Sequence, residues 1–354
     1  AGRQTGSEGR LCADLRSGYS TRRLNCQTAG LVPRAGCLQS WDMTSAFALP
    51  EWSALADLAD DELPLLGSAL LIAHDEYPDM DAGACDALVE AHVLSLRTEL
   101  EPIDSNPLKM QAINHRLFDE LGYAGNHAEY YDPRNSYMNE VLSRRLGNPI
   151  SLAMVQMEVA RRLGIPLDGV SFPGHFLVRL PVDDGVLVMD PFNRGRPLNA
   201  DELRQRARPH YGEEVPDEAL MQILSPASPR TILVRMLRNL HALYSESGDW
   251  ARAVRCTDRI LSLVPDNAEA LRDRGWGYSE LGHQAGAHLD LGRYLQLNPE
   301  TDDAEAVRNR IVEQGRVEQG QADTLRRWTR IAMGVLLALV TLHLVKVPLT
   351  AFAF

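Results

Sequence analysis

Apolar residues recur three or four positions apart between about 51 and 146, which is the spacing of one face of a helix. The first members of this series are Leu55, Leu58, Leu66, Leu70 and Ala73. The spacing predicts further helices over 85–100, 108–121 and 136–146. Prolines separate these segments, at positions 64, 78, 102, 107 and 133. The front of the chain is therefore predicted to be helical.

The next helix has the clearest start and end in the chain. Asn148 can cap its first turn, and Pro149 suits the first helical position because that position needs no N–H donor. The helix is expected to end before Gly164, which Pro166 follows two residues later. Its apolar face repeats every three or four residues, at Leu152, Val155, Val159 and Leu163.

Three short segments that alternate or are rich in β-branched residues follow, and we predict strands over 170–172, 175–180 and 185–190. Asp183, Asp184 and Gly185 form the turn of a hairpin between the last two. Helices followed by hairpin strands predict an α+β domain over 46–228, with a helical part at 46–146 and the core at 147–228.

From about Arg230 a longer period appears, in which four pairs of like residues are each separated by 34 positions. They are Tyr244 and Tyr278, Gly248 and Gly282, Ala253 and Ala287, and Pro265 and Pro299. This is the period of the tetratricopeptide repeat, a pair of antiparallel helices. Small alanines let paired helices approach, and proline ends the second helix of each pair. We expect such repeats over 229–318, with a third helix around 303–314, because two repeats are too few for a free-standing array.

The chain ends in an apolar segment. Three arginines, at 326, 327 and 330, precede Ile331–Val345, and Lys346 interrupts before the last residues up to Phe354. Fifteen residues are short of the ~20 that cross hydrocarbon, but twenty-four suffice if Lys346 snorkels to the interface. We therefore predict a membrane anchor over 326–354, with the arginines holding the main body on the cytoplasmic side. The alternative is a helix buried against the repeats.

The composition is that of a globular protein with an acidic surface. The 354 residues are 45% hydrophobic and 24% charged, and their formal net charge is -12. This charge argues against nucleic acid as a partner, since phosphate neutralisation takes clustered Lys and Arg. Residues 49–104 hold fourteen acids and a single Arg97, which we interpret as a solvated face. No spacing predicts a metal site, and no cofactor is expected.

The first 45 residues differ in character from the rest. They hold three of the five cysteines, six arginines and no hydrophobic period. Five cysteines without C-x-x-C spacing predict neither a zinc site nor a disulfide framework, which fits a reducing compartment. We expect residues 1–45 to be a disordered extension or a mis-assigned start, with Met43 as the natural first residue.

Two residues of the predicted hairpin are candidates for chemistry. His175 and Asp190 lie fifteen positions apart across the turn, which places them nearly opposite each other. Because neighbours on adjacent strands can hydrogen-bond, Asp190 is expected to fix the tautomer of His175 and to stabilise its charged form.

Four motifs, in order, resemble the transglutaminase-like superfamily: GNPISLA from Gly147, ARRLGIP from Ala160, PGHFLVR from Pro173 and DPFN from Asp190. The closest match is the bacterial Sir-B-type branch, in which such a domain precedes tetratricopeptide repeats, and it covers roughly 55–299. The resemblance implies a papain/transglutaminase-like core. It also implies a Cys at the helix N-terminus that attacks an amide, a His that activates it and an Asp that orients the His. The last two positions fall on His175 and Asp190.

The chain departs from this family at the nucleophile. Aligning the helix by Ala153 and Gly164 puts the Cys position on Pro149, which has no nucleophilic atom. Ser151 would lie in the first helical turn, where free N–H groups and the helix dipole could lower its pKa or stabilise an oxyanion. In the alternative interpretation, Ser151 only satisfies a local backbone group.

Several other residues are expected to line the cleft. Arg179 is in phase with His175 along the strand and could hold a carboxylate. The full set is Asn148, Pro149, Tyr131, Arg179 and Asn193.

These patterns lead to hypotheses of different classes. The first is a regulator tethered to the cytoplasmic face of the inner membrane, or simply cytoplasmic, whose degenerate domain binds a peptide-like ligand while the repeat groove recruits a protein partner. The second is a serine-dependent amide or ester hydrolase, or acyltransferase, that uses Ser151, His175 and Asp190. In a third, His175 alone is a general base.

Overall fold

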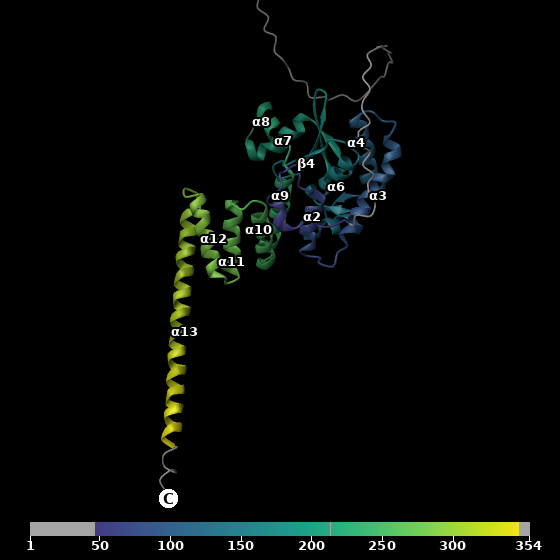
Figure 1. Cartoon of the computed structure of the whole chain (residues 1–354). Coiled ribbons are helices and arrows are strands. Elements are labelled where there is room, and N and C mark those ends of the chain that lie inside the picture. The colour runs from purple at the N-terminus through teal and green to yellow at the C-terminus, as the bar shows by residue number, and fades with distance from the viewer. Residues whose placement is uncertain (1–46, 213, 347–354) are drawn as a thin grey trace, which may run out of the picture. The chain divides into compact units, whose positions relative to one another are not determined.

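The computed structural model describes residues 47–346 apart from residue 213 (Figure 1). It divides into two compact units, 1–239 and 240–354. The predicted N-terminal extension over 1–45 lies outside the described residues, as does the end of the predicted anchor, 347–354.

Helices dominate the first unit and surround two small sheets. The helices are α1 (Trp52–Leu55), α2 (Leu65–His74), α3 (Ala82–Leu100), α4 (Asn106–Asn114), α5 (Met138–Arg144), α6 (Pro149–Arg162), α7 (Ala200–Tyr211) and α8 (Asp217–Ile223). The strands are β1 (Ala124–Gly125), β2 (Leu146–Gly147), β3 (Asp168–Val170), β4 (Leu177–Val182), β5 (Gly185–Asp190) and β6 (Arg196–Leu198). Short turns of other helix types lie at His115–Glu120, Pro133–Asn135 and Pro191–Asn193.

The main sheet is antiparallel, in the order β3-β4-β5-β6, and helices cover both of its faces (Figure 1). Side chains alternate between the faces of a strand. Val188 and Leu198 are buried with Leu203 of α7 and Leu220 of α8. Val178 points to the opposite face, where α6 contacts β3 and β4. The α+β architecture predicted from the sequence is thus confirmed.

Helix α6 begins and ends where the sequence predicts, but its surroundings are different. Eleven of its fourteen residues are buried, so it is a central helix and not one with a single apolar face. The reason is its position between the sheet and α2, α3, α4 and α5. Its buried Glu158 accepts hydrogen bonds from Arg161 and Arg162, and Arg162 also donates to Glu90 of α3. This charge network ties α6 to α3.

The predicted helices at 85–100, 108–121 and 136–146 correspond to α3, to α4 with the turn that continues it, and to α5. The strand at 185–190 is also confirmed, as β5. The first two strands are shifted, because a turn centred on Gly174 (φ 66°) separates them and places His175 before β4. Strand β6 and helices α7 and α8 were not predicted.

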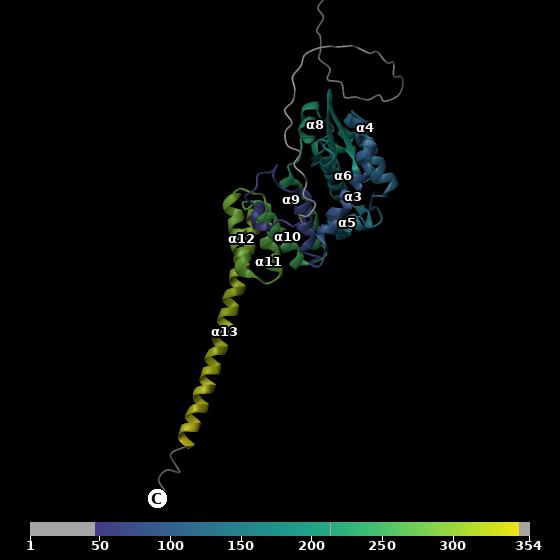
Figure 2. The same ribbon diagram turned by 45° about the vertical axis from the view of Figure 1, so that its right-hand side comes forward.

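The second unit consists of consecutive antiparallel helices that lie side by side (Figures 1 and 2). They are α10 (Trp250–Leu263), α11 (Ala268–Glu280), α12 (Gln284–Leu297) and α13 (Ala304–Lys346). Helix α9 (Pro229–Glu246) has its last residues in this unit and its first residues in the other. As predicted, α10 and α12 each end two residues before a proline.

The 34-residue period has a structural cause in the turns between helices. Gly248 and Gly282 have φ of 76° and 77°, values that favour glycine. In both turns the residue after the glycine, Asp249 or His283, donates its N–H to the carbonyl of Tyr244 or Tyr278, at 2.8 Å. Two turns of identical geometry are therefore spaced by one repeat, and each reverses the chain.

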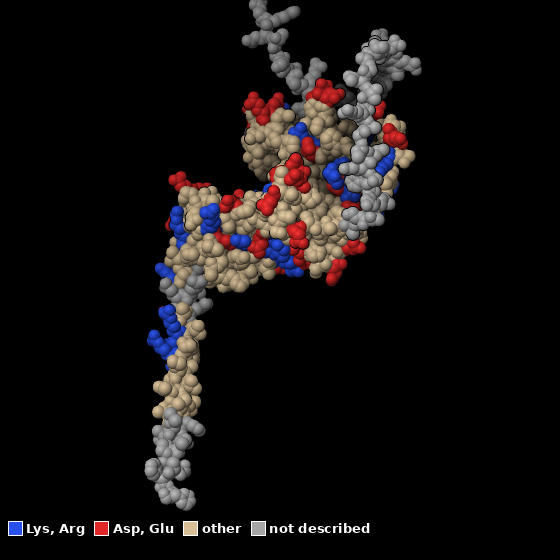
Figure 3. All heavy atoms as spheres, viewed as in Figure 1, with Lys and Arg blue, Asp and Glu red and all other residues tan. Residues whose placement is uncertain are grey.

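Helix α13 is much longer than the predicted segment 303–314. It continues to Lys346, and Figure 3 shows basic side chains on it followed by a stretch without charge. Exposed apolar residues of this stretch include Met333 and Leu337. Within residues 47–346, however, no helix is both long and apolar enough to cross a membrane. The predicted membrane anchor is therefore not supported there.

Glycines allow the helices of the second unit to approach closely. A Cβ on Gly277 would lie 2.5 Å from Cγ2 of Val254 in α10, whereas a Cβ on Gly292 would meet no atom within 4 Å. Val254 is β-branched and cannot easily turn away.

We predict that Gly277→Ala lowers the free energy of unfolding by about 1 kcal/mol or more, although alanine favours a helix. Gly292→Ala is the matched control and should leave this free energy unchanged or raise it. Urea unfolding of the full chain, followed by circular dichroism, measures both. Equal stability of the two variants would contradict the close packing of α10 on α11.

Candidate functional site

The site is organised by Asp190, the last residue of β5. Its side chain is fully buried and caps the short helical turn that follows. Asn193 supplies two donors, its backbone N–H at 3.3 Å and its side-chain amide at 2.7 Å. Asn193 was predicted to belong to the site, and the structure brings it to Asp190.

His175 is held by the same carboxylate. Its Nε2 lies 2.8 Å from Oδ1 of Asp190, and its side chain is 19% exposed. The register pairs Val178 with Met189, so His175 is a diagonal neighbour of Asp190 across the hairpin. Since an ionised carboxylate only accepts hydrogen bonds, the imidazole proton is on Nε2 and Nδ1 remains available to a ligand.

Arg206 of α7 is a third partner of Asp190 that the sequence did not reveal. Its Nη1 lies 2.8 Å from Oδ2. Burial acts to raise the pKa of Asp190, but the hydrogen bonds and charges of His175, Arg206 and Asn193 outweigh it and hold that pKa well below its ordinary range. One pattern in the sequence could have indicated this contact: Arg206 lies beside the apolar face that Leu203 and Ala207 form on α7.

Ser151 is not available as a nucleophile in this conformation. Its side chain is fully buried, and its hydroxyl accepts the N–H of Asn148 at 3.0 Å and donates to the carbonyl of Asn135 at 2.7 Å. The Asn148 side chain accepts the N–H of Ser151 at 3.0 Å, which completes a capping box. In the described part of the chain, no hydrogen bond joins Ser151 to His175.

This capping box belongs to a buried polar network that closes the start of α6. Asn148 donates to the Ser136 hydroxyl at 2.8 Å, and Asn126 donates to Asn135 at 3.0 Å. Pro149 is buried at the first helical position. A Cβ on Gly147 would lie 2.6 Å from the Ser151 hydroxyl, so the backbone covers that group closely. Asn148, Pro149 and Ser151 are therefore structural neighbours of the site.

The Phe192 ring lies beside His175, and further aromatic rings pack against Phe192. The Phe192 ring centroid lies 6.0 Å from that of His175, 4.5 Å from that of His127 and 5.7 Å from that of Tyr130. Tyr131 packs edge-on against Tyr130 and is 73% exposed. We call Phe192, His127, Tyr130 and Tyr131 the aromatic surface. Of these, only Tyr131 was among the predicted site residues.

Arg179 does not reach the site, although it was predicted there. Its Nη1 donates to the carbonyl of Leu224 at 2.7 Å, at the end of α8, and its Nε lies 4.0 Å from Asp168. Because side chains alternate along a strand, Arg179 lies on the same face of the sheet as Asp190. Its side chain, however, points to the opposite end of that face, towards Leu224.

Arg235 of α9 holds the loop that carries His175. It donates to the carbonyls of Phe172 at 3.0 Å and His175 at 2.6 Å, and to the hydroxyl of Ser171 at 2.6 Å. Its guanidinium lies over the ring of Phe176, and burial lowers its pKa. One arginine thus fixes the loop from Ser171 to His175.

The arrangement can accept a hydrogen bond or a proton at His175 Nδ1 beside aromatic rings. It contains a histidine–carboxylate pair, and within the described ranges no serine, threonine or cysteine side chain hydrogen-bonds to the His175 imidazole. The described residues include no group of three His, Cys, Asp or Glu placed to hold a metal ion.

Two family models match the chain. Residues 84–238 match the transglutaminase-like superfamily, and residues 240–312 match the tetratricopeptide repeat. A UPF0162 protein of Xylella fastidiosa is 64% identical over 77% of this chain and 97% of its own length. A UPF0162 protein of Pseudomonas aeruginosa is 33% identical over 70% of this chain and 90% of its own length. Human F-box only protein 21 is 31% identical over 49% of this chain but only 28% of its own length.

We predict that Asp190→Asn lowers the free energy of unfolding at pH 7 by about 3 kcal/mol or more, because it leaves Arg206 without its charged partner. The folded-state pKa of Asp190 lies below the ordinary 3.8, so its contribution is present above that pH and is lost as the pH falls towards the folded-state value. The difference between wild type and variant should therefore shrink from pH 7 to pH 3.

Urea unfolding at both pH values measures this difference. Asp201→Asn is the matched control, since Asp201 is on α7 and its side chain is 95% exposed. A difference that is the same at pH 7 and pH 3 would show that the charge of Asp190 is not what stabilises the fold.

Proposed function

This chain belongs to the UPF0162 family, and we propose that its transglutaminase-like domain binds a peptide segment without forming a covalent bond to it. The tetratricopeptide repeats indicate a role in protein interaction, and we assign them a protein partner. The proposed protein is thus a two-module binding protein and not a transglutaminase or protease.

One observation carries this proposal: the hydroxyl of Ser151 is buried and committed to the backbone of Asn135 and Asn148. Nucleophilic catalysis requires the hydroxyl to give its proton to a base within hydrogen-bond reach. The base at hand, His175, has no such contact with Ser151, and Pro149 offers no nucleophile. Freeing Ser151 would break the capping box that starts α6.

The geometry around His175 supports ligand binding. The Nδ1 atom of a neutral imidazole is an acceptor, and a peptide presents an N–H at every residue except proline. The exposed rings of Tyr130 and Tyr131, which lie beyond the buried Phe192 ring from His175, supply apolar area with little conformational freedom to lose on binding. Asp190 keeps the imidazole oriented, so the acceptor is fixed before the ligand arrives.

The His175–Asp190 pair favours one second candidate, a general base acting on water or on a ligand hydroxyl. A buried ionised carboxylate stabilises the imidazolium that such a reaction forms. Hydrolysis of an amide or ester that persists in Ser151→Ala and disappears in His175→Gln would establish this candidate over simple binding.

We predict that a fluorophosphonate probe does not label the wild-type protein. Ser151→Ala should leave this result unchanged and lower the free energy of unfolding by about 1–3 kcal/mol, because buried donors lose their partner. Mass spectrometry of the intact chain and urea unfolding measure the two effects. Stoichiometric labelling that Ser151→Ala abolishes would refute the proposal in favour of a serine enzyme.

We predict that peptides selected on the wild-type protein from a phage-displayed random library bind Tyr131→Ala about tenfold more weakly, since truncating an aromatic anchor costs more than 1 kcal/mol. The stability of the variant should be unchanged, because Tyr131 is exposed. Leu94→Ala, at an exposed residue of α3, is the control and should bind normally. Fluorescence anisotropy gives the dissociation constants, and failure to select any peptide would contradict the proposal.

A further inference from the structure

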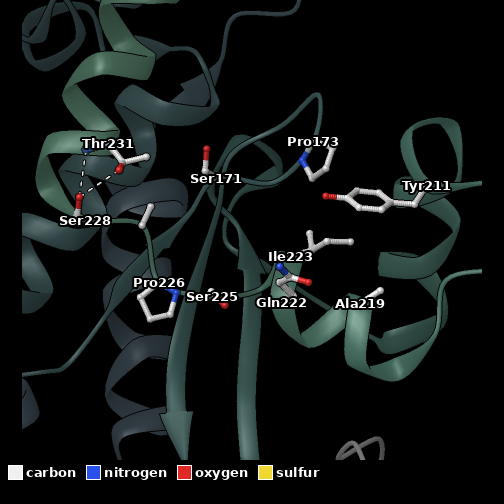
Figure 4. A pocket seen from close by; sticks show the side chains of 11 residues that line it. Ser171, Pro173, Tyr211, Ala219, Gln222, Ile223, Ser225, Pro226, Ser228 and Thr231 are labelled. Carbon is white, nitrogen blue, oxygen red and sulfur yellow. Dashed lines mark hydrogen bonds between the residues drawn. The ribbon is translucent and has the colours of Figure 1, made fainter. Parts of the chain in front are cut away.

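A cavity lies beside the candidate site, within the first unit (Figure 4). Its volume of about 560 Å³ is that of a small-molecule site. Three segments form it: the loop before β4, the end of α7, and the stretch from α8 to the first turn of α9. None of the residues of the aromatic surface lines this cavity.

The two ends of the cavity differ in chemistry. At one end the hydroxyls of Ser228 and Thr231 are 3.1 Å apart, and Ser171 lies between this pair and Pro173 in the view of Figure 4. At the other end, the ring of Tyr211 directs its hydroxyl towards Pro173. The remaining lining residues are Ala219, Gln222, Ile223, Ser225, Pro226 and Ala227.

Among the residues that the structure describes, no charged side chain lines the cavity. A charged ligand group would lose water there and find no oppositely charged side chain among these lining residues, which is costly. The hydroxyls at the polar end already have partners in the protein, since Ser228 and Thr231 bond to each other. Ser171 likewise accepts from Arg235 at 2.6 Å. Their oxygens and the Gln222 amide can still take part in a further hydrogen bond with a ligand. The lining therefore fits a neutral ligand that offers hydrogen-bonding groups and apolar surface together.

The cavity is physically connected to His175. Ser171 and Pro173 belong to the same loop as His175, and four residues of chain span at most about 14 Å. Arg235 binds both ends of this loop, through the Ser171 hydroxyl and the His175 carbonyl. A short extended peptide could therefore contact His175 and the cavity at once.

We propose that this cavity is a second subsite for the peptide bound at His175, and that it selects an uncharged stretch of that peptide. The inference rests on the proposed function. It adds a specificity: the segment next to the His175 contact carries neither acidic nor basic side chains.

A peptide fits the lining better than a sugar does. The lining residues that the structure describes include a single side-chain amide, Gln222, and no carboxylate or guanidinium, which are the groups that bind paired sugar hydroxyls in a bidentate way. Its ring surfaces, from Tyr211, Pro173 and Pro226, are of the kind that receive extended peptide. The edge of β3 already binds backbone in this region, since Ala227 donates its N–H to the Gly169 carbonyl at 2.8 Å.

The test fills the cavity without touching His175. Ser225 is exposed at the cavity wall, so Ser225→Trp introduces a ring into the cavity and leaves the core intact. Met221→Trp is the matched control, because Met221 is exposed on α8, four residues before Ser225, but outside the lining. Peptides are selected on the full wild-type chain from a phage-displayed random library and are then made as N-acetylated, C-amidated forms.

We expect the selected peptides to share an uncharged stretch. Their dissociation constants should rise about tenfold or more on Ser225→Trp and stay unchanged on Met221→Trp, and placing Lys or Asp in the uncharged stretch should weaken binding to the wild type. Binding that depends on Tyr131 but not on Ser225→Trp would overturn the subsite and leave the proposed function standing. Selection of no peptide would overturn both, and binding of a neutral oligosaccharide that Ser225→Trp abolishes would overturn the peptide assignment.

Discussion

A buried carboxylate needs donors on all sides, and in this protein that requirement brings the parts of the site together. The oxygens of Asp190 receive hydrogen bonds from His175 before β4, Asn193 after β5 and Arg206 on α7. Without these partners, burying the charge would cost several kcal/mol. The Asp190 carboxylate therefore fixes three elements relative to one another: the residues before β4, the turn after β5, and helix α7. The orientation of the imidazole is a consequence of this arrangement.

The start of α6 differs from what the resemblance to transglutaminases implies for this position. The resemblance to transglutaminases implies that this position carries the attacking atom of an enzyme. Here Pro149 occupies it, and the hydroxyl of Ser151 and the amide of Asn148 satisfy each other and the neighbouring backbone. Pro149 has no N–H, and the N–H groups of Ser151 and Leu152 already donate to Asn148, so they are not free to bind an oxyanion. The imidazole–carboxylate pair is present and the Ser151 hydroxyl is bonded to backbone, and this geometry is what supports the proposed binding role.

The two units achieve their shapes by different means. In the second unit, the same turn at Gly248 and at Gly282 reverses the chain before α10 and before α12. The lack of a side chain at Gly277 lets α11 approach α10 closely. In the first unit, contacts between residues far apart in sequence dominate, as with Arg235, which binds the loop before His175 from 60 residues away. A repeat array offers an extended surface to a partner, whereas the first unit offers a small preorganised site.

The features that follow from the sequence alone are those with local causes. The start and end of α6, the hairpin that brings Asp190 to His175 and the 34-residue period all depend on residues within one helix, one turn or one repeat, so they could be predicted. The other contacts of the site depend on how the helices and strands pack against one another. Ser151 meets the carbonyl of Asn135, sixteen residues earlier, Arg179 turns to Leu224, forty-five residues later, and Arg206 reaches Asp190 from a helix that was not predicted. A side chain's partner at such separations depends on how the elements pack, and neither periodicity nor spacing encodes that.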